Sequence, residues 1–370
     1  MGFTRSLALG LLCSLPLFNV ALAAPTSASD AAPRSAIAVK LNKSASRARS
    51  VAGADVVEDL IRKAQSGSTH AKRDAQFNVL PLITTLTPEK ISELVQRATE
   101  LTPSYKPADF GSWFQVQFPG FYGLTRTTPR LVSIAHGAQG HVVGITRTVG
   151  GGPVENEPEA IMDAAAYLSA GDVMLLEMQT GDANNDLWPI EILDAQFDAI
   201  SLATALGIVV IEPAANGAQD LDQPVLRVGE TTAVALLNKD SPDFRDSGAI
   251  MVGAGSTTVQ HSRLSFSNYG SRVDVYSWGE GIATTSVNTA DFSNDDIYDD
   301  FDGTSGAAPI VAGAALSIQG MVNVNRGSKL TPAEMRSLIT VGGTASANPS
   351  TDKIGVQPNL RALIDGGYLQ

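Results

Sequence analysis

The residues best placed to do chemistry lie around Ser305, in the sequence GTSGAAP at positions 303–309. Gly303 permits a tight turn, and Ser305 stands where a helix can begin, so unpaired backbone N–H groups would favour negative charge developing beside its hydroxyl. The small residues that follow let such a helix pack closely, and Pro309 falls in its first turns, where proline is best tolerated. These features suit a serine nucleophile in acyl transfer. The alternative is a buried helix of small residues with a serine as its N-cap.

The serine turn resembles the nucleophile turn of the subtilisin-like serine peptidases, or subtilases, and three further blocks are similar to segments of that family. These blocks are 172–179 (DVMLLEMQ), 207–217 (GIVVIEPAANG) and 267–281 (SNYGSRVDVYSWGEG). The resemblance implies hydrolysis of peptide bonds through an acyl-enzyme on Ser305. It also implies that the first third of the chain is similar to a subtilase propeptide.

The resemblance assigns roles to residues around the serine. Asn216 takes the place of the asparagine that donates to the oxyanion of the tetrahedral intermediate, and such a donor contributes about 3–4 kcal/mol. The block at 172–179 is similar to the strand along which these enzymes lay the substrate, which implies that an extended peptide binds by strand addition. The substrate-binding residues implied are Leu176, Glu177, Met178, Ala214 and Ala215. An Asn rather than an Asp at position 216 leaves the sedolisins, acid-acting relatives with a similar serine turn, as a minor alternative.

After residue 134 the chain alternates apolar strands with helices. We expect strands at 142–145, 172–176, 207–211 and 249–253, and helices at 158–170 and 195–206. Near-continuous apolar strands separated by helices predict an α/β fold, with a doubly wound, mainly parallel sheet covered on both faces. A last helix should begin after Thr331 as N-cap, with Pro332 first and Glu334 completing a capping box. Residues 134–370 are therefore predicted to form a partial subtilisin-like catalytic domain.

The N-terminal third is predicted to have three parts. Residues 1–23 have the charge, apolar run and small-residue ending of a secretory signal peptide cut after Ala23, which predicts a secreted, extracellular protein. Residues 24–49, rich in Ala, Ser and Pro, should form a flexible leader with little order. Residues 50–120 should form a small α+β propeptide-like region, with helices at 56–64 and after Thr87 and a strand at 113–116.

The composition of the chain limits the kinds of molecule that it is expected to bind. The chain has 26 basic and 38 acidic residues and a net charge of −12, which argues against nucleic acid and anionic membranes. Cys13 is the only cysteine, so a mature chain would have no disulfides and no cysteine metal sites. After residue 23 we expect no stretch approaching the ~20 apolar residues that cross a bilayer. We expect a monomer acting on polypeptides, with no cofactor and no metal. The Asp-rich loop at 291–302 leaves calcium binding open, although a solvated loop is favoured.

The chain has no clear base for Ser305. Neither His70 nor His261 matches a catalytic histidine block, and His136 aligns better with the segment that follows the catalytic helix in subtilases. No Asp lies between residues 110 and 134, where the orienting carboxylate should be. That span is too short for two strands, a helix and their loops. The Asp and His blocks are therefore missing from the recorded sequence.

Two explanations stay open. A deletion in the recorded sequence is favoured, because Ser305 and Asn216 persist together with the substrate-strand block. The alternative is a non-catalytic pseudopeptidase that binds extended peptides or acts as an inhibitor. In either case we expect the chain as written to hydrolyse peptide bonds negligibly and to resist fluorophosphonate, because nothing in the sequence polarises Ser305. Strands left uncovered, at 142–145 and 174–176, should make it marginally stable.

Overall fold

The computed structural model describes residues 18–21, 36–41, 78–117, 134–135, 138–149, 152–285 and 297–370. Its main sheet has the strand order β15-β16-β12-β11-β10-β7. The five neighbours from β16 to β7 in this order are parallel to one another, and β15 is antiparallel to β16. The strands are β7 (Val173–Leu175), β10 (Val209–Pro213), β11 (Ile250–Gly255), β12 (Val275–Trp278), β15 (Thr344–Ala345) and β16 (Val356–Gln357). The predicted mainly parallel α/β sheet is confirmed.

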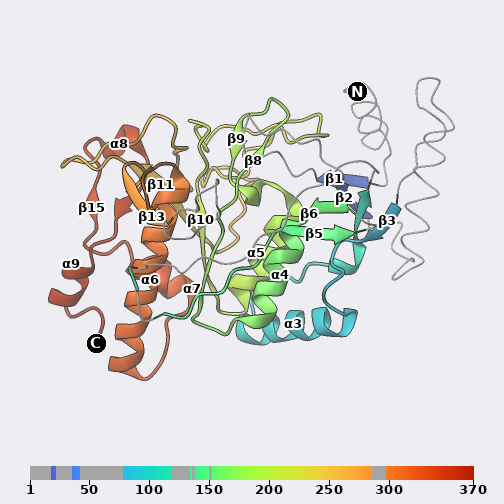
Figure 1. Ribbon diagram of the computed structural model, residues 1–370, viewed down its shortest axis with the longest axis horizontal. Helices are drawn as coiled ribbons and strands as arrows, with labels where there is room; N and C mark the ends of the chain where they lie inside the picture. The colour runs from blue at the N-terminus through green and yellow to red at the C-terminus, as the bar shows by residue number, and fades with distance from the viewer. Residues whose placement is uncertain are drawn as a thin grey trace.

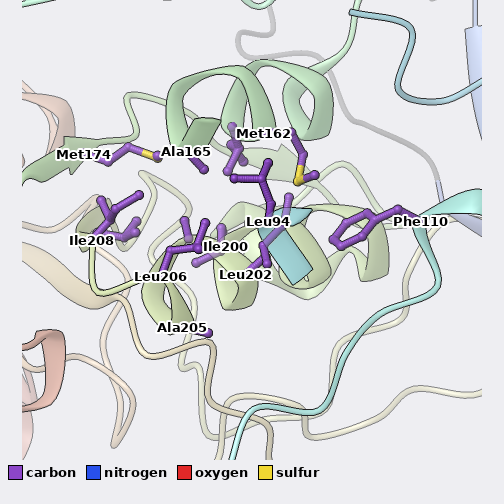
Figure 2. Packing of buried hydrophobic residues seen from close by; sticks show 14 of the residues in the cluster. Leu94, Phe110, Met162, Ala165, Met174, Ile200, Leu202, Ala205, Leu206 and Ile208 are labelled. Carbon is purple, nitrogen blue, oxygen red and sulfur yellow. The ribbon is translucent and has the colours of Figure 1, made fainter. Parts of the chain in front are cut away.

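Helices cover both faces of this sheet, as Figure 1 shows, with α6 on one side and α4 and α5 on the other. Alternate residues of β10 serve the two faces: Val210 packs towards α4 and α5, whereas Val209 and Ile211 pack against α6. Figure 2 shows the first of these cores. Strands buried on both faces need continuous apolar sequence, which is why the pattern could be read from the chain. The helices are α4 (Glu157–Tyr167), α5 (Asp194–Ala205), α6 (Thr304–Arg326), α7 (Pro332–Leu338), α8 (Pro349–Asp352) and α9 (Leu360–Asp365).

The local start signals of the helices are confirmed. Helix α7 follows Thr331, which forms the complete capping box with Glu334. Helix α3 (Pro88–Leu101) follows Thr87, whose hydroxyl accepts from the Lys90 N–H. Each N-cap satisfies backbone donors that have no partner inside the helix.

The N-terminal region forms an antiparallel sheet in the order β1-β2-β4-β3 together with α3. Its strands are β1 (Phe18–Ala21), β2 (Ala36–Leu41), β3 (Asn78–Pro81) and β4 (Trp113–Gln117). The expectation of little order throughout 24–49 is wrong, because Ala36–Leu41 pairs with β4. Composition predicted a flexible leader there, but the alternating sequence AIAVKL favours a β-strand that pairs with a neighbouring strand. The helix expected at 56–64 lies outside the described residues, and the signal peptide stays a prediction.

This region shares one buried core with the helices of the main sheet. Leu94 and Trp113 belong to the same buried cluster as Met162 and Ile200, which lie on α4 and α5 (Figure 2). Polar contacts reinforce the packing: Asn156 Nδ2 donates to the Leu82 carbonyl at 2.7 Å. The N-terminal region therefore packs on α4 and α5, the helices that cover one face of the main sheet.

Two sequence expectations need correction. Residues 142–145 are not a strand, and Val142 and Val143 are 61% and 41% exposed. The chain becomes extended only at β5 (Thr146–Val149), which forms a hairpin with β6 (Gly152–Glu155). Apolar content alone could not decide this, since a strand also needs a partner. Contrary to expectation, helix α6 is long and apolar enough to cross a membrane. Its apolar side chains are, however, largely buried in the core.

Short elements complete the described chain around the site. The strand pairs are β8 (Thr180–Gly181) with β9 (Leu187–Trp188), and β13 (Ile282–Thr285) with β14 (Ile297–Phe301). Short 3₁₀ turns lie at Phe110–Ser112 and Ile190–Ile192. The pair β13 and β14 leads directly into the serine turn at the start of α6.

Candidate active site

Ser305 is the second residue of α6 and is half-buried. The preceding Gly303 has φ +111°, a backbone conformation that side chains rarely adopt, and its N–H donates to the Gly279 carbonyl at 2.9 Å. Gly279 follows β12 and in turn donates to Gly255 at the end of β11, at 3.0 Å. The serine turn is therefore fixed to the carboxyl ends of two neighbouring strands, the edge where open α/β sheets bind ligands.

Asn216 lies beyond the end of β10 and is linked to the serine turn through Thr304. Its Oδ1 accepts from the Thr304 N–H at 2.9 Å and from the Thr304 hydroxyl at 2.8 Å. Because a backbone N–H needs an acceptor, this contact fixes which end of the amide faces Thr304. Nδ2 lies next to Gly303, where a Cβ would come within 3.1 Å of it. The amide N–H₂ of Asn216 makes no hydrogen bond within the described part of the chain and can donate to a ligand.

The loop that carries Asn216 is held by Asn268, a fully buried residue. Asn268 Oδ1 accepts from the Gly217 N–H at 3.0 Å and the Gln219 N–H at 2.8 Å, and its Nδ2 donates to the Leu187 carbonyl at 2.9 Å. Sequence reasoning matched the block 267–281 but assigned no role to this asparagine. The sequence signal that could have identified this role was the Asn at position 268 of the matched block.

Glu177 follows β7 in the chain, and Ser305 is close enough to influence the pKa of its carboxyl group. Glu177 is exposed to solvent as a residue, although neighbouring protein atoms partly desolvate its carboxyl group. Burial raises the pKa of the Glu177 carboxyl to about 8, and the effect of Ser305 opposes this rise. A residue expected to bind substrate thus lies in the neighbourhood of the serine.

The other expected substrate-binding residues offer little side chain. Leu176 is 4% exposed, and Ala214 and Ala215 are fully buried, while Met178 is half-buried against the core. Ala215 has φ +75°, so the chain turns sharply just before Asn216. The side chains of these residues are therefore largely withdrawn from solvent.

The described histidines are engaged away from Ser305. His141 Nε2 lies 3.3 Å from the Tyr167 hydroxyl, and His261 Nδ1 lies 2.7 Å from the Ser256 carbonyl. His70 and His136 lie outside the described residues. Among the residues that the structure describes, no group of three or more His, Cys, Asp or Glu side chains could hold a metal ion, and residues 291–296 of the acidic loop lie outside them.

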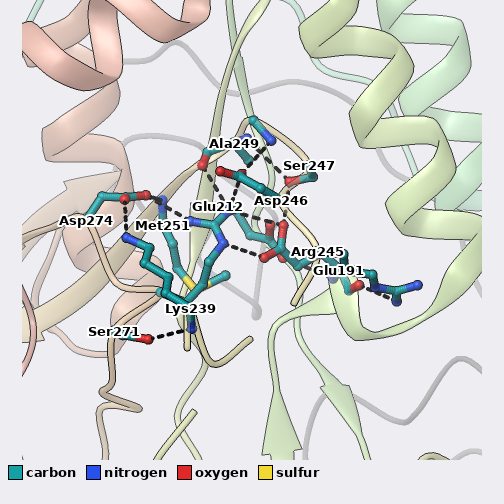
Figure 3. A network of polar contacts seen from close by, with 12 residues as sticks. Glu191, Glu212, Lys239, Arg245, Asp246, Ser247, Ala249, Met251, Ser271 and Asp274 are labelled. Atoms are coloured by element: carbon teal, nitrogen blue, oxygen red, sulfur yellow. Dashed lines mark hydrogen bonds and ion pairs between the residues drawn. The ribbon is translucent and has the colours of Figure 1, made fainter. Parts of the chain in front are cut away.

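A buried charge network stabilises the strand that leads to Asn216 (Figure 3). Arg272 contacts Glu191 at 2.7 Å and Asp274 at 2.9 Å, and both Arg272 and Glu191 have no exposed side-chain surface. Glu212, on β10, accepts through Oε1 from the Glu191 N–H at 3.2 Å. Burial, and next the charge of Glu191, raise the pKa of Glu212 well above its usual value. Both effects favour the protonated form of the Glu212 carboxyl group.

Fold and site together define an α/β protein with a serine at a helix N-terminus and an asparagine amide beside it. The model of the subtilase family matches residues 130–354, and the chain belongs to that family.

The chain is also similar to known proteases over part of their length. An extracellular protease from Xanthomonas campestris pv. campestris is 25% identical over 248 residues, which cover 66% of this chain and 38% of that protein. Proteases from Pseudoalteromonas arctica have 21% identity and a TM-score of 0.39, covering 56% of this chain and 57% of theirs. A cold-adapted subtilisin-like serine proteinase has 24% identity and a TM-score of 0.37, covering 57% and 63%. The chain thus spans less than two thirds of the length of each of these relatives.

Proposed function

We propose that this protein is a secreted serine endopeptidase homologue, in which Ser305 forms the acyl-enzyme and Asn216 stabilises the oxyanion. The observation that carries this proposal is the double contact of Thr304 with Asn216 Oδ1. It holds the amide with Nδ2 beside the start of α6, where the Ser305 N–H also makes no hydrogen bond within the described residues. Two N–H donors next to one hydroxyl form the arrangement that stabilises a developing oxyanion.

An extended polypeptide is the proposed ligand. Among the described strands β7 is the edge of the main sheet, and Glu177 and Gln179 follow it into the site. A peptide added along this edge would pair its backbone with the strand and bring one carbonyl to Ser305. Secretion is proposed from the signal-like residues 1–23, and the relative in Xanthomonas campestris is named an extracellular protease. We propose a monomer, with no cofactor.

Peptide hydrolysis by the chain as written should be negligible, because no described histidine contacts Ser305. Sequencing the transcript across the codons for residues 118–134 decides between the two explanations. A restored segment with an Asp and a His-Gly-Thr sequence would establish an endopeptidase with a complete triad. A transcript that agrees with the recorded chain would favour a pseudopeptidase that binds extended peptides.

The site itself is tested by binding of a peptidyl boronic acid, which forms a tetrahedral adduct with a serine hydroxyl. We expect Ser305→Ala to abolish binding and Asn216→Ala to weaken it about a hundredfold to a thousandfold. Asn325→Ala serves as the matched control, because Asn325 lies near the far end of α6 and bonds the Leu369 carbonyl. Equal affinity of the original chain and Ser305→Ala would refute the proposal.

A further inference from the structure

We infer that Gln179 is a positioning residue of this site, which holds the backbone of Asn216 so that the Asn216 amide points at the oxyanion. The inference rests on the proposed function, because it takes Ser305 as the nucleophile and Asn216 as the donor. It deepens that function by adding a residue to which the resemblance gave no role of its own.

The side chain of Gln179 contacts the main chain of Asn216 directly. Gln179 Oε1 accepts from the Asn216 N–H at 3.0 Å. The side chain of Asn216 is held separately, because its Oδ1 accepts from the N–H and the hydroxyl of Thr304 at 2.9 and 2.8 Å. Gln179 thus holds the backbone of the donor residue and Thr304 its side chain, and two such anchors together define where Nδ2 lies.

The loop around Asn216 needs contacts of this kind. Ala215 has φ +75°, a conformation that persists only where surrounding contacts impose it. The Gly217 and Gln219 N–H groups donate to Asn268 Oδ1, and the Ala218 N–H donates to the Phe266 carbonyl at 2.8 Å.

Residues 266 and 268 therefore bind the three N–H groups that follow Asn216. The N–H of Asn216 itself, at the turn, is bound by Gln179.

Gln179 is itself held in place by strand pairing on both sides. Before it, the Leu176 N–H donates to the Ile211 carbonyl at 2.9 Å and continues the pairing of β7 with β10. Directly after it, Thr180 begins β8 and pairs with Trp188 of β9. A side chain that extends from a backbone fixed at both ends is suited to positioning a neighbour.

The hairpin of β8 and β9 also contacts the far side of the same loop. The Leu187 carbonyl, on β9, accepts from Asn268 Nδ2 at 2.9 Å, and a Cβ at Gly217 would clash with that carbonyl. The loop that carries Asn216 is therefore tied to the hairpin at both ends, through Gln179 before β8 and through Leu187 on β9.

This arrangement predicts a selective effect on the oxyanion. A donor stabilises a developing charge only when it is held in the right geometry beforehand, and a hydrogen bond weakens steeply as that geometry is lost. A peptide in its ground state would pair with the edge of β7 and depend less on the Asn216 amide. Loss of the Gln179 acceptor should therefore weaken a tetrahedral adduct more than a bound peptide.

The test compares two ligands of the full chain: a peptidyl boronic acid, which forms a tetrahedral adduct, and the same peptide ending in an amide. Gln179→Met keeps the length of the side chain without the acceptor. We expect it to weaken boronate binding about tenfold and to leave binding of the peptide amide unchanged. Gln179→Ala is a second variant with the same expected result. Gln96→Met is the matched control and should change neither affinity, because Gln96 lies exposed on α3 and donates to Glu100 at 2.8 Å.

A double-mutant cycle tests whether Gln179 acts through Asn216. In the Asn216→Ala chain, Gln179→Met should lower boronate affinity no further, because the donor that it positions is already gone. A further tenfold loss there would overturn the inference.

The other outcomes separate this inference from the proposed function. Unchanged boronate affinity in the Gln179 variants, or equal losses for the two ligands, would overturn the inference and leave Ser305 as the nucleophile. Unfolding of both variants, seen by circular dichroism, would also overturn it, since Gln179 would then support the fold rather than the donor. Boronate binding that does not need Ser305 would overturn the proposed function itself.

Discussion

Replacing Arg272 by Met should be among the most destabilising single changes in this fold. The substitution keeps an unbranched stem but removes contacts to Glu191 (2.7 Å) and to the Ala249 carbonyl (3.0 Å), whereas Asp274 keeps Arg336 at 2.8 Å. Glu191 would then be a buried charge without its cation, close to Glu212. Removing one partner of a buried ion pair costs about 3–5 kcal/mol, a large part of the ~5–15 kcal/mol that stabilises a typical protein.

Equilibrium unfolding in urea, followed by tryptophan fluorescence, measures this change. Arg361→Met is the control, because its side chain is 81% exposed and its pair with Asp365 spans 4.0 Å, so it should change stability by less than about 1 kcal/mol. If Arg272→Met does not fold, adding Glu191→Gln should restore folding, since both charges are then removed. A stability loss below about 1 kcal/mol for Arg272→Met would refute the argument.

Three other outcomes follow from the structure. Glu212→Gln should match the original chain near pH 4 and become more stable than it as the pH rises to 8. Above the usual pKa of 4.5 the unfolded state releases the Glu212 proton while the native state keeps it, so the native state loses stability as the pH rises towards the raised pKa. Equal urea midpoints of Glu212→Gln and the original chain at pH 8 would contradict this. In a gene product with a complete triad, Asn216→Ala should lower kcat about a hundredfold to a thousandfold with little change in KM. An unchanged kcat in steady-state kinetics would show that Asn216 does not stabilise the oxyanion. Residues 24–370 should aggregate or unfold at low urea concentrations, because β7 is an uncovered edge strand among the described strands. A monomer that unfolds in one sharp transition at high urea would instead favour an evolved non-catalytic protein.

Local chemistry explains what could be predicted about the fold. The caps at Thr87 and Thr331 and the turn at Gly303 depend on residues within a few positions of each other, so their sequence was sufficient. Residues 142–145 show the limit, because an apolar run forms a strand only where a neighbouring strand supplies hydrogen bonds. Ala36–Leu41 shows the converse: its partner β4 is distant in the chain, and composition alone suggested a leader.

For the site, the sequence by itself determined the identity of the nucleophile candidate and its amide donor, since Ser305 and Asn216 stand in motifs whose residue types are tied to one chemistry. It also determined that no histidine block stands between residues 110 and 134 where one is expected. Only the tertiary structure decided that Glu177 lies in the neighbourhood of Ser305, that Thr304 orients Asn216, and that burial favours the protonated form of Glu212. The physical reason is that contacts and desolvation depend on which strand ends meet at one edge of the sheet, and residues far apart in the chain carry no local signal of that meeting.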